Sequence, residues 1–242
     1  MRKFVGLAIA IAGLVAITAA AIADQAGPSP SGQIQTLDAS HSPNKASKKR
    51  KKVGTKVKIT LNLKKTDGTQ PSPTVDAIVT LPKGMGLNYT KFVTCDQAKL
   101  QAQGPSGCPG KSKVGTGKLT AGAEPVIPSV NGTVTAFNGK NKTYLLYVVP
   151  EISSPLVIPG KLKGKSVLDF DVPLVPTLPG QPNATLTFFE VTTGGKAKKG
   201  RKRFNYLENP TKCPKGGWLW KIAFKYENGE SLAPTDAATC KK

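Results

Sequence analysis

The clearest alternation of apolar and polar residues lies near the end of the chain. Large apolar side chains occupy every second position there: Trp218, Trp220, Ile222, Phe224 and Tyr226. Because side chains alternate between the two faces of a β-strand, all of these would lie on one face. Lysines and smaller residues take the other face, as in an antiparallel sheet that packs on one face only. We therefore predict a core strand here, followed by a returning strand within residues 231–239.

The same period-two pattern recurs through most of the chain. Residues 55–63 alternate cleanly, and further strands are expected at 75–81, 114–120, 131–137, 143–149, 157–163, 167–172, 184–193 and 204–207. Pro-Gly pairs at 159–160 and 179–180 and the loop 138–142 predict turns between them. No long helical pattern intervenes. The sequence thus predicts an all-β fold, an antiparallel β-sandwich of immunoglobulin-like or related type with about ten strands.

One short helix is expected, near Cys95–Gln103. Thr94, with a glutamine three residues later, has the spacing of a capping box at the helix start. Gly104-Pro105 is a typical helix end. Isolated helices of this length are only marginally stable, so we expect a nearby disulfide to hold the helix in place.

The chain has four cysteines: Cys95, Cys108, Cys213 and Cys240. Three pairings are possible, and we favour the sequential one because each bond then closes a local loop rich in Gly and Pro. Such a bond contributes about 3 kcal/mol on the loop-entropy model. The rival interpretation, a metal site, lacks a Cys-x-x-Cys spacing, and the only histidine, His41, is far away in sequence. We expect neither a metal nor a cofactor.

The first residues have the features of a secretory signal peptide. In residues 1–23 a basic start, Arg2-Lys3, precedes an apolar run that ends in Ala21-Ile22-Ala23. A retained membrane anchor is the alternative, since the run is about long enough to span a bilayer. Residues 24–52 are predicted to be a disordered tether with a basic stem, and residues 53–242 the β-sandwich domain, as one unit or two packed subdomains. We expect a secreted or cell-surface-associated protein.

The net charge of the chain is strongly positive. It has 35 Lys and Arg against 14 Asp and Glu, a formal charge of +21, and removing Arg2 and Lys3 leaves +19. Two runs concentrate this charge: the stem, Lys48, Lys49, Arg50, Lys51 and Lys52, and a hairpin tip, Lys196, Lys198, Lys199, Arg201, Lys202 and Arg203.

Basic runs of this kind attract polyanions, and arginine can bind phosphate oxygens in a bidentate manner. The alternative for each run is a solvated segment that also keeps neighbouring strand edges apart. We expect anionic cell-wall polymer or lipid headgroups as partners. Nucleic acid is less favoured, because its recognition needs exposed aromatic platforms and the aromatic stripe described above is predicted to be core.

Catalytic chemistry has few candidates. There is one histidine to act as a base, no Gly-x-Ser-x-Gly motif and no phosphate-binding glycine loop before a helix. Asp169 and Asp171 are two apart on a predicted strand, a spacing compatible with a divalent cation or a catalytic carboxylate pair. The plainer interpretation is two aspartates on a polar face. We therefore predict an exported, non-enzymatic β-sandwich protein that associates with the cell envelope or another polyanionic surface through its basic segments. The alternatives are a carbohydrate-active or cation-dependent enzyme using Asp169 and Asp171, and a purely structural surface protein.

Several short motifs within about residues 56–240 give the chain a resemblance to other proteins. They are Leu81-Pro82-Lys83-Gly84, Thr94-Cys95 with the helix up to Gly107-Cys108-Pro109, Tyr144-Leu145-Leu146-Tyr147, and Lys212-Cys213-Pro214-Lys215-Gly216-Gly217-Trp218 through Cys240. In these motifs the chain resembles a group of secreted, β-rich actinobacterial proteins of unknown function. The resemblance implies a disulfide-bonded β-fold and no activity, substrate or catalytic residue.

Overall fold

The computed structural model describes residues 25–124 and 127–242; the predicted signal peptide, residues 1–23, lies outside them. Nearly all regular structure in the described residues is β-strand. The strands are β1 (Gln25–Ala26), β2 (Gln33–Ser42), β3 (Gly54–Lys65), β4 (Thr74–Thr80), β5 (Gly86–Leu87), β6 (Lys113–Ala123), β7 (Ile127–Asn138), β8 (Thr143–Pro150), β9 (Leu156–Lys163), β10 (Val167–Asp171), β11 (Thr185–Thr193), β12 (Lys196–Lys199), β13 (Lys202–Asn205), β14 (Leu207–Glu208), β15 (Trp218–Tyr226), β16 (Ser231–Leu232) and β17 (Thr235–Ala238). The α-helix is α1 (Gln97–Gln103), and short 3-10 turns lie at Tyr89–Lys91, Gly104–Gly107 and Gly110–Ser112.

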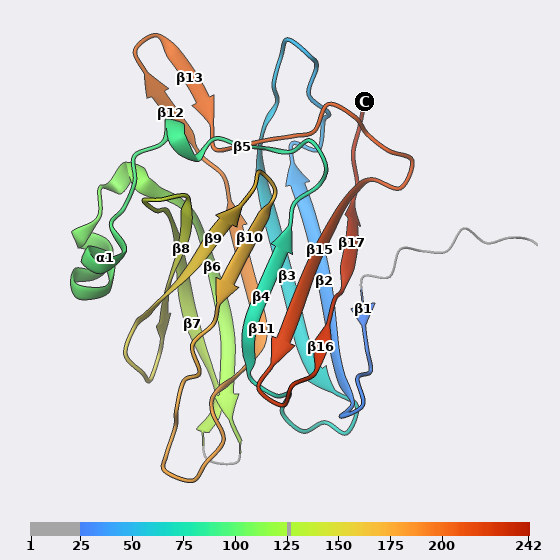
Figure 1. Cartoon of the computed structure of the whole chain (residues 1–242), viewed down its shortest axis with the longest axis vertical. Helices are drawn as coiled ribbons and strands as arrows, with labels where there is room; N and C mark the ends of the chain where they lie inside the picture. The colour runs from blue at the N-terminus through green and yellow to red at the C-terminus, as the bar shows by residue number, and fades with distance from the viewer. Residues whose placement is uncertain (1–24, 125–126) are drawn as a thin grey trace, which may run out of the picture.

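A single antiparallel sheet forms the body of the molecule (Figure 1). Its main path runs β1-β2-β3-β11-β6-β7-β8-β9-β10-β4-β15-β16, and β12 and β13 form a separate two-stranded ribbon. The twelve strands of the main path curl into a near-closed barrel. The all-β antiparallel prediction is confirmed. The prediction of a sandwich is wrong, because one continuous sheet encloses the core.

Side chains join the two edges of the sheet where β2 meets the β15–β17 hairpin. Asp236 Oδ2 accepts the backbone N–H of Ala39 at 2.7 Å, and the Tyr226 hydroxyl donates to the side-chain carbonyl of Gln35. Side-chain hydrogen bonds therefore connect the two edges across this seam, although the amide nitrogen of Gln35 is buried there without a partner among the described residues.

The aromatic strand is a core strand, as predicted. In β15 the side chains at alternate positions from Trp218 to Tyr226 are all buried, and β15 pairs with β4 on one side and with β16 and β17 on the other. The Cys213–Cys240 disulfide ties the end of the hairpin to the segment before it. Together with the Cys95–Cys108 bond, it confirms the sequential pairing.

The segment predicted to be a disordered tether contains one of the longest strands. Residues 33–42 form β2, which pairs with β3 along its whole length, from Gln33 opposite Lys65 to Ser42 opposite Lys56. The prediction of disorder is wrong here. The segment has few large aliphatic residues, because the inward positions of β2 include amides and His41, and a strand with polar inward residues lacks the apolar alternation by which strands are recognised. Hydrogen bonds across the seam make the burial of these polar side chains possible.

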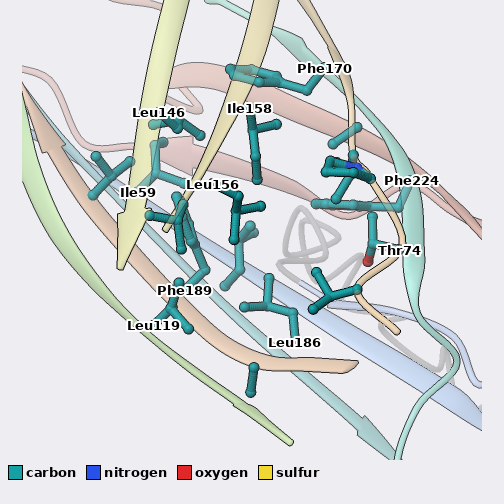
Figure 2. Close-up of a pocket in the computed structure, with 18 of the residues that line it drawn as sticks. Ile59, Thr74, Leu119, Leu146, Leu156, Ile158, Phe170, Leu186, Phe189 and Phe224 are labelled. Carbon is teal, nitrogen blue, oxygen red and sulfur yellow. The ribbon is translucent and has the colours of Figure 1, made fainter. Parts of the chain in front are cut away.

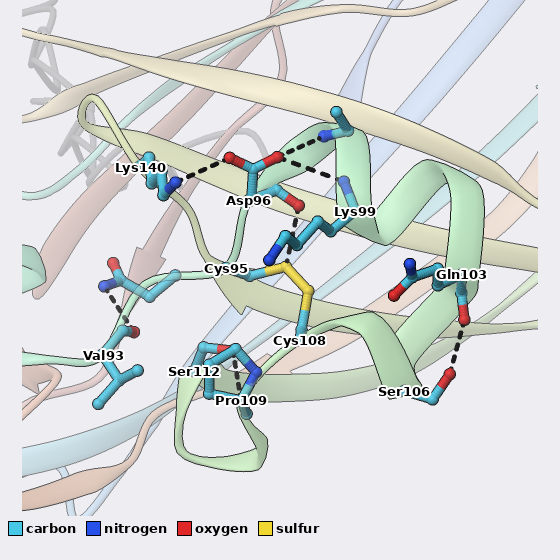
Figure 3. The surroundings of a disulfide bond; sticks show 12 residues. Val93, Cys95, Asp96, Lys99, Gln103, Ser106, Cys108, Pro109, Ser112 and Lys140 are labelled. Carbon is cyan, nitrogen blue, oxygen red and sulfur yellow. Dashed lines mark hydrogen bonds and ion pairs between the residues drawn. A yellow bond between two sulfur atoms is a disulfide. The ribbon is translucent and has the colours of Figure 1, made fainter.

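Helix α1 packs on the outer surface of the barrel over β7, β8 and β9. Its buried Leu100 joins Phe137, Leu145 and Val157, which face outward from the strands, in a second small core. The Cys95–Cys108 disulfide fastens the two ends of this unit (Figure 3). None of the helices in the described part of the chain has the length and apolar character that a membrane span requires.

The helix start and one turn differ from the prediction. Asp96, and not Thr94, caps α1, because its carboxylate accepts the backbone N–H groups of Ala98 and Lys99 (Figure 3). Pro159-Gly160 was predicted to be a turn but lies inside β9, where the missing side chain of Gly160 leaves space for the ring of Phe170.

Candidate ligand-binding cavity

The barrel encloses an apolar cavity of about 320 Å³ (Figure 2). Inward side chains of several strands line it, among them Ile59, Leu146, Ile158, Phe170 and Phe224. Among the described residues that line the cavity, none is an aspartate, glutamate, lysine, arginine or histidine. The wall is therefore uncharged and mostly apolar.

Small residues at inward positions leave the space unfilled. Ala77 on β4 and Ala121 on β6 both face the cavity, where neighbouring inward positions carry Val or Leu. Protein interiors are normally packed as densely as organic crystals. An unfilled apolar space of about 320 Å³ that is of the size usual for ligand pockets is better explained as a ligand site than as a packing defect.

The cavity reaches the surface at one end of the barrel, here called the mouth. Ile152 in the β8–β9 loop and Leu174 in the β10–β11 loop line the cavity, yet they are 60% and 41% exposed. Both loops lie at the lower end of the barrel in Figure 1. The longer loop, residues 172–184, also exposes Leu178. A ligand would enter between these two loops.

The other end of the cavity, here called the deep end, is closed by polar groups that satisfy one another. The Tyr144 hydroxyl hydrogen-bonds to Thr193, and the Tyr206 hydroxyl donates to Asn138 Oδ1 at 3.2 Å. The Asn138 amide donates in turn to the Tyr89 carbonyl at 3.0 Å. Burial raises the pKa of both tyrosines, so the phenols are neutral at ordinary pH.

One polar atom near the mouth is different. Oγ1 of Thr74 is shielded from solvent and has no hydrogen-bond partner among the described residues. The register between β4 and β15 shifts at this point, so that Thr74 lies directly opposite Tyr226 and Val75 is left over. Such a bulge re-aims a side chain, and it places Thr74 on the inner face with the Tyr226 ring. Figure 2 shows Thr74 on the cavity wall below Phe224.

The mouth end carries no basic residues in its connections. Successive strands of the barrel run in opposite directions, so alternate connections lie at the same end. Those at the mouth are residues 27–32, 66–73, 151–155, 172–184 and 227–230, and none of them contains a lysine or arginine. The acids at this end are Asp67, Glu124, Glu151, Glu227 and Glu230.

The predicted polyanion-binding residues lie at the opposite end. The hairpin residues occupy β12, β13 and the turn between them, which project beyond the barrel wall. The stem residues lie in the β2–β3 connection, where Lys48 and Lys51 form an isolated bridge. Figure 1 shows both segments at the upper end of the barrel. The structure thus brings the two basic runs to one end, here called the basic end.

The candidate acid pair lies outside the cavity. Leu168 and Phe170 of β10 line the cavity, so Asp169 and Asp171 point away from it. Asp169 forms an ion pair with Lys163, and this hydrogen bond raises the lysine pKa. Within the described residues no cluster of three or more His, Cys, Asp or Glu could hold a metal ion.

Sequence reasoning missed both the cavity and Thr74. Two alanines at inward strand positions could have indicated the cavity. They can be recognised as inward only after each strand residue has been assigned to the inner or the outer face of the sheet. The signal for Thr74 is a register shift, which one strand alone does not reveal.

Comparisons with models of protein families, with curated proteins and with solved structures give no match.

Proposed function

We propose that this protein binds a small apolar ligand, such as a lipid chain, inside its barrel. The observation that carries the proposal is the cavity of about 320 Å³, open at the mouth and lined without a charged side chain in the described residues. Ligand pockets usually measure about 300–1,000 Å³ and are mostly apolar. The two disulfides are consistent with an oxidising, extracellular environment, where a lipid would need shielding from water.

Displacement of an environment-sensitive apolar dye tests this proposal directly. Each buried methylene contributes about 0.8 kcal/mol, so the affinity of n-alkylbenzenes should rise about fourfold per methylene until the chain fills the cavity. Saturation at about a hundred times Kd adds about 2.7 kcal/mol to the free energy of unfolding, which raises Tm by about 5–10 °C.

Two variants separate the cavity from the outer surface. Ala121→Phe places a ring in the cavity and should weaken binding at least tenfold. Ala223→Phe is the matched control, because Ala223 lies between the buried Ile222 and Phe224 of β15 and so faces outward. Equal binding by the two variants, or no binding of any apolar probe to the wild type, would contradict the proposal.

We also propose that the basic end associates with an anionic envelope surface, through wall polymer or lipid headgroups. The observation that supports it is the pairing within the β12–β13 ribbon, where Lys198 lies opposite Arg203 and Lys199 opposite Lys202. Like charges directly opposite one another destabilise a strand pair. These pairs lower the stability of the ribbon, so its concentration of cationic residues is better explained by binding than by folding.

Retention on vesicles that contain anionic phospholipid tests the basic end, at low salt where screening is weakest. The ribbon variant combines Lys198→Gln, Arg201→Gln and Arg203→Gln. The control variant neutralises three exposed lysines of the barrel wall, Lys118→Gln, Lys161→Gln and Lys221→Gln. The ribbon variant should lose more retention than the control. Equal retention would show that the ribbon is not the contact.

A further inference from the structure

We propose further that the ligand is a single-chain amphiphile with an uncharged, hydrogen-bonding head, which inserts chain first and leaves its head at Thr74 in the mouth. This inference rests on the proposed binding of an apolar ligand in the barrel. It adds the class of ligand, its orientation and the residue that selects its head.

The orientation follows from where free polar groups lie. At the deep end the hydroxyls of Tyr144 and Tyr206 are already bonded to Thr193 and Asn138. A polar head placed there would have to break those bonds, and a buried polar group without a partner is costly. The hydrocarbon chain therefore occupies the deep end, and the head remains near the mouth.

Thr74 supplies the partner for the head. Thr74 lines the cavity, but its hydroxyl is covered by its neighbours and is unpaired among the described residues. Rotation of the Thr74 side chain about χ1 would turn this hydroxyl toward a ligand, where it can both donate and accept a hydrogen bond. The backbone beside it is held in place, because the N–H of Glu227 donates to the Pro73 carbonyl at 2.8 Å and that of Asn228 to Ser72 Oγ at 3.2 Å. An unpaired hydroxyl on a backbone that is held in place is suited to a single polar group on a ligand.

The charges at the mouth favour an uncharged head, because the connections there carry acids and no lysine or arginine, and Lys65 at the end of β3 is already paired with Asp67. An anionic head beside Thr74 would lie near Glu227, whose backbone N–H donates to the Pro73 carbonyl, with no lysine or arginine in the mouth connections to compensate for it. A cationic head would be attracted to this carboxylate, but beside Thr74 it would lose its hydration against a mostly apolar lining. An alcohol, ester or amide head avoids both penalties.

The cavity volume limits the ligand to one chain. A space of about 320 Å³ lies at the lower end of the usual range for ligand pockets, about 300–1,000 Å³. A space of this size suits one hydrocarbon chain better than the paired chains of a membrane phospholipid.

The experiment compares an n-alkanol, the alkanoate and the alkylamine of the same chain length, and an n-alkylbenzene as a reference without a hydrogen-bonding head. Dye displacement gives each affinity for the wild-type protein. We expect the alkanol to bind more tightly than the alkanoate and the alkylamine. If either charged ligand binds as tightly as the alkanol, the assignment of an uncharged head is wrong.

Variants at the mouth identify the residues responsible. Thr74→Val removes the hydroxyl at nearly constant shape and should lower the ratio of alkanol to alkylbenzene affinity about threefold to tenfold. Thr74→Ser keeps the hydroxyl and should largely keep the ratio. Glu227→Gln should improve binding of the alkanoate. An unchanged ratio in Thr74→Val, with both ligands still bound, overturns the role of Thr74.

The outcomes separate this inference from the function on which it rests. If the wild-type protein binds no alkylbenzene, the proposed binding of an apolar ligand fails. If it binds alkylbenzene but shows no dependence on Thr74 or on head charge, only the inference about the head fails. Unfolding curves of each variant confirm that a lost ratio is not caused by a lost fold.

Discussion

The seam of the barrel predicts a specific pH dependence of stability, because it contains the only histidine of the chain. His41 on β2 is 7% exposed. Its Nδ1 lies 2.7 Å from Asn209 Oδ1, and its Nε2 lies 3.0 Å from the indole nitrogen of Trp220. An indole N–H can only donate, so Nε2 accepts and Nδ1 carries the proton. Both ring nitrogens are therefore satisfied only while the imidazole is neutral.

The sign and size of the effect follow from this arrangement. Burial lowers the pKa of His41, and the hydrogen bond to Asn209 opposes this shift only in part. Below the ordinary histidine pKa of about 6.5, the unfolded chain binds a proton that the folded chain does not. The free energy of unfolding then falls by about 1.4 kcal/mol per pH unit until the folded pKa is reached. Above about pH 6.5 the histidine contributes no pH dependence.

Urea unfolding followed by tryptophan fluorescence between about pH 7 and pH 5 measures this slope. Carboxylates titrate mainly below that window, so the single histidine dominates it. In the His41→Gln variant an amide replaces the imidazole, and the slope should disappear even if overall stability falls. The reasoning is refuted if wild type and His41→Gln lose stability in parallel as the pH falls, or if the wild type becomes more stable.

Three further changes should alter stability in defined ways. Asp96→Ala should cost about 1 kcal/mol in urea unfolding, because it removes the cap of α1; no loss would show that the cap does not stabilise the helix. Replacing both cysteines of the 213–240 disulfide should cost about 3.5 kcal/mol, against about 3 kcal/mol for the 95–108 disulfide, because it closes the longer loop; the reverse order in urea titrations would contradict the loop argument. Hydrogen bonds from Ser31 and Ser29 lower the pKa of Glu230 to about 2, so its contribution is present above its ordinary pKa and is lost as the pH falls toward 2. Glu230→Gln should therefore flatten the acid limb of the stability curve, and an unchanged limb would rule that contribution out.

The strands were predictable because their signal is local. The aromatic positions of β15 and the aliphatic positions of β3 alternate without interruption, and period two has no competing explanation there. The disulfide pairing was also predictable, since each bond joins cysteines close in sequence. The cap of α1 was misassigned because Thr94 and Asp96 are both good capping residues, and only the backbone decides which of them precedes the first helical turn.

The closure of the sheet could not be predicted from the same pattern. A sandwich and a barrel both alternate buried and exposed positions along each strand, so Val57 or Ile222 would look identical in either fold. The deciding contacts join β2 to β15 and β17 at the seam. There the buried residues include Gln35 and His41. Polar residues at inward positions interrupt the apolar alternation, so a prediction based on hydrophobicity does not recognise the strand.

The location of the basic and acidic groups has a simpler origin. In an antiparallel sheet each connection reverses the chain, so alternate connections lie at opposite ends. Once the strands are assigned, the sequence places Lys48–Lys52 and Lys196–Arg203 at one end and Glu151 and Glu227 at the other. A total charge of +21 conceals this division. The end with the apolar opening is the end without basic residues in its connections, so contact of the basic end with an anionic surface would leave the mouth uncovered.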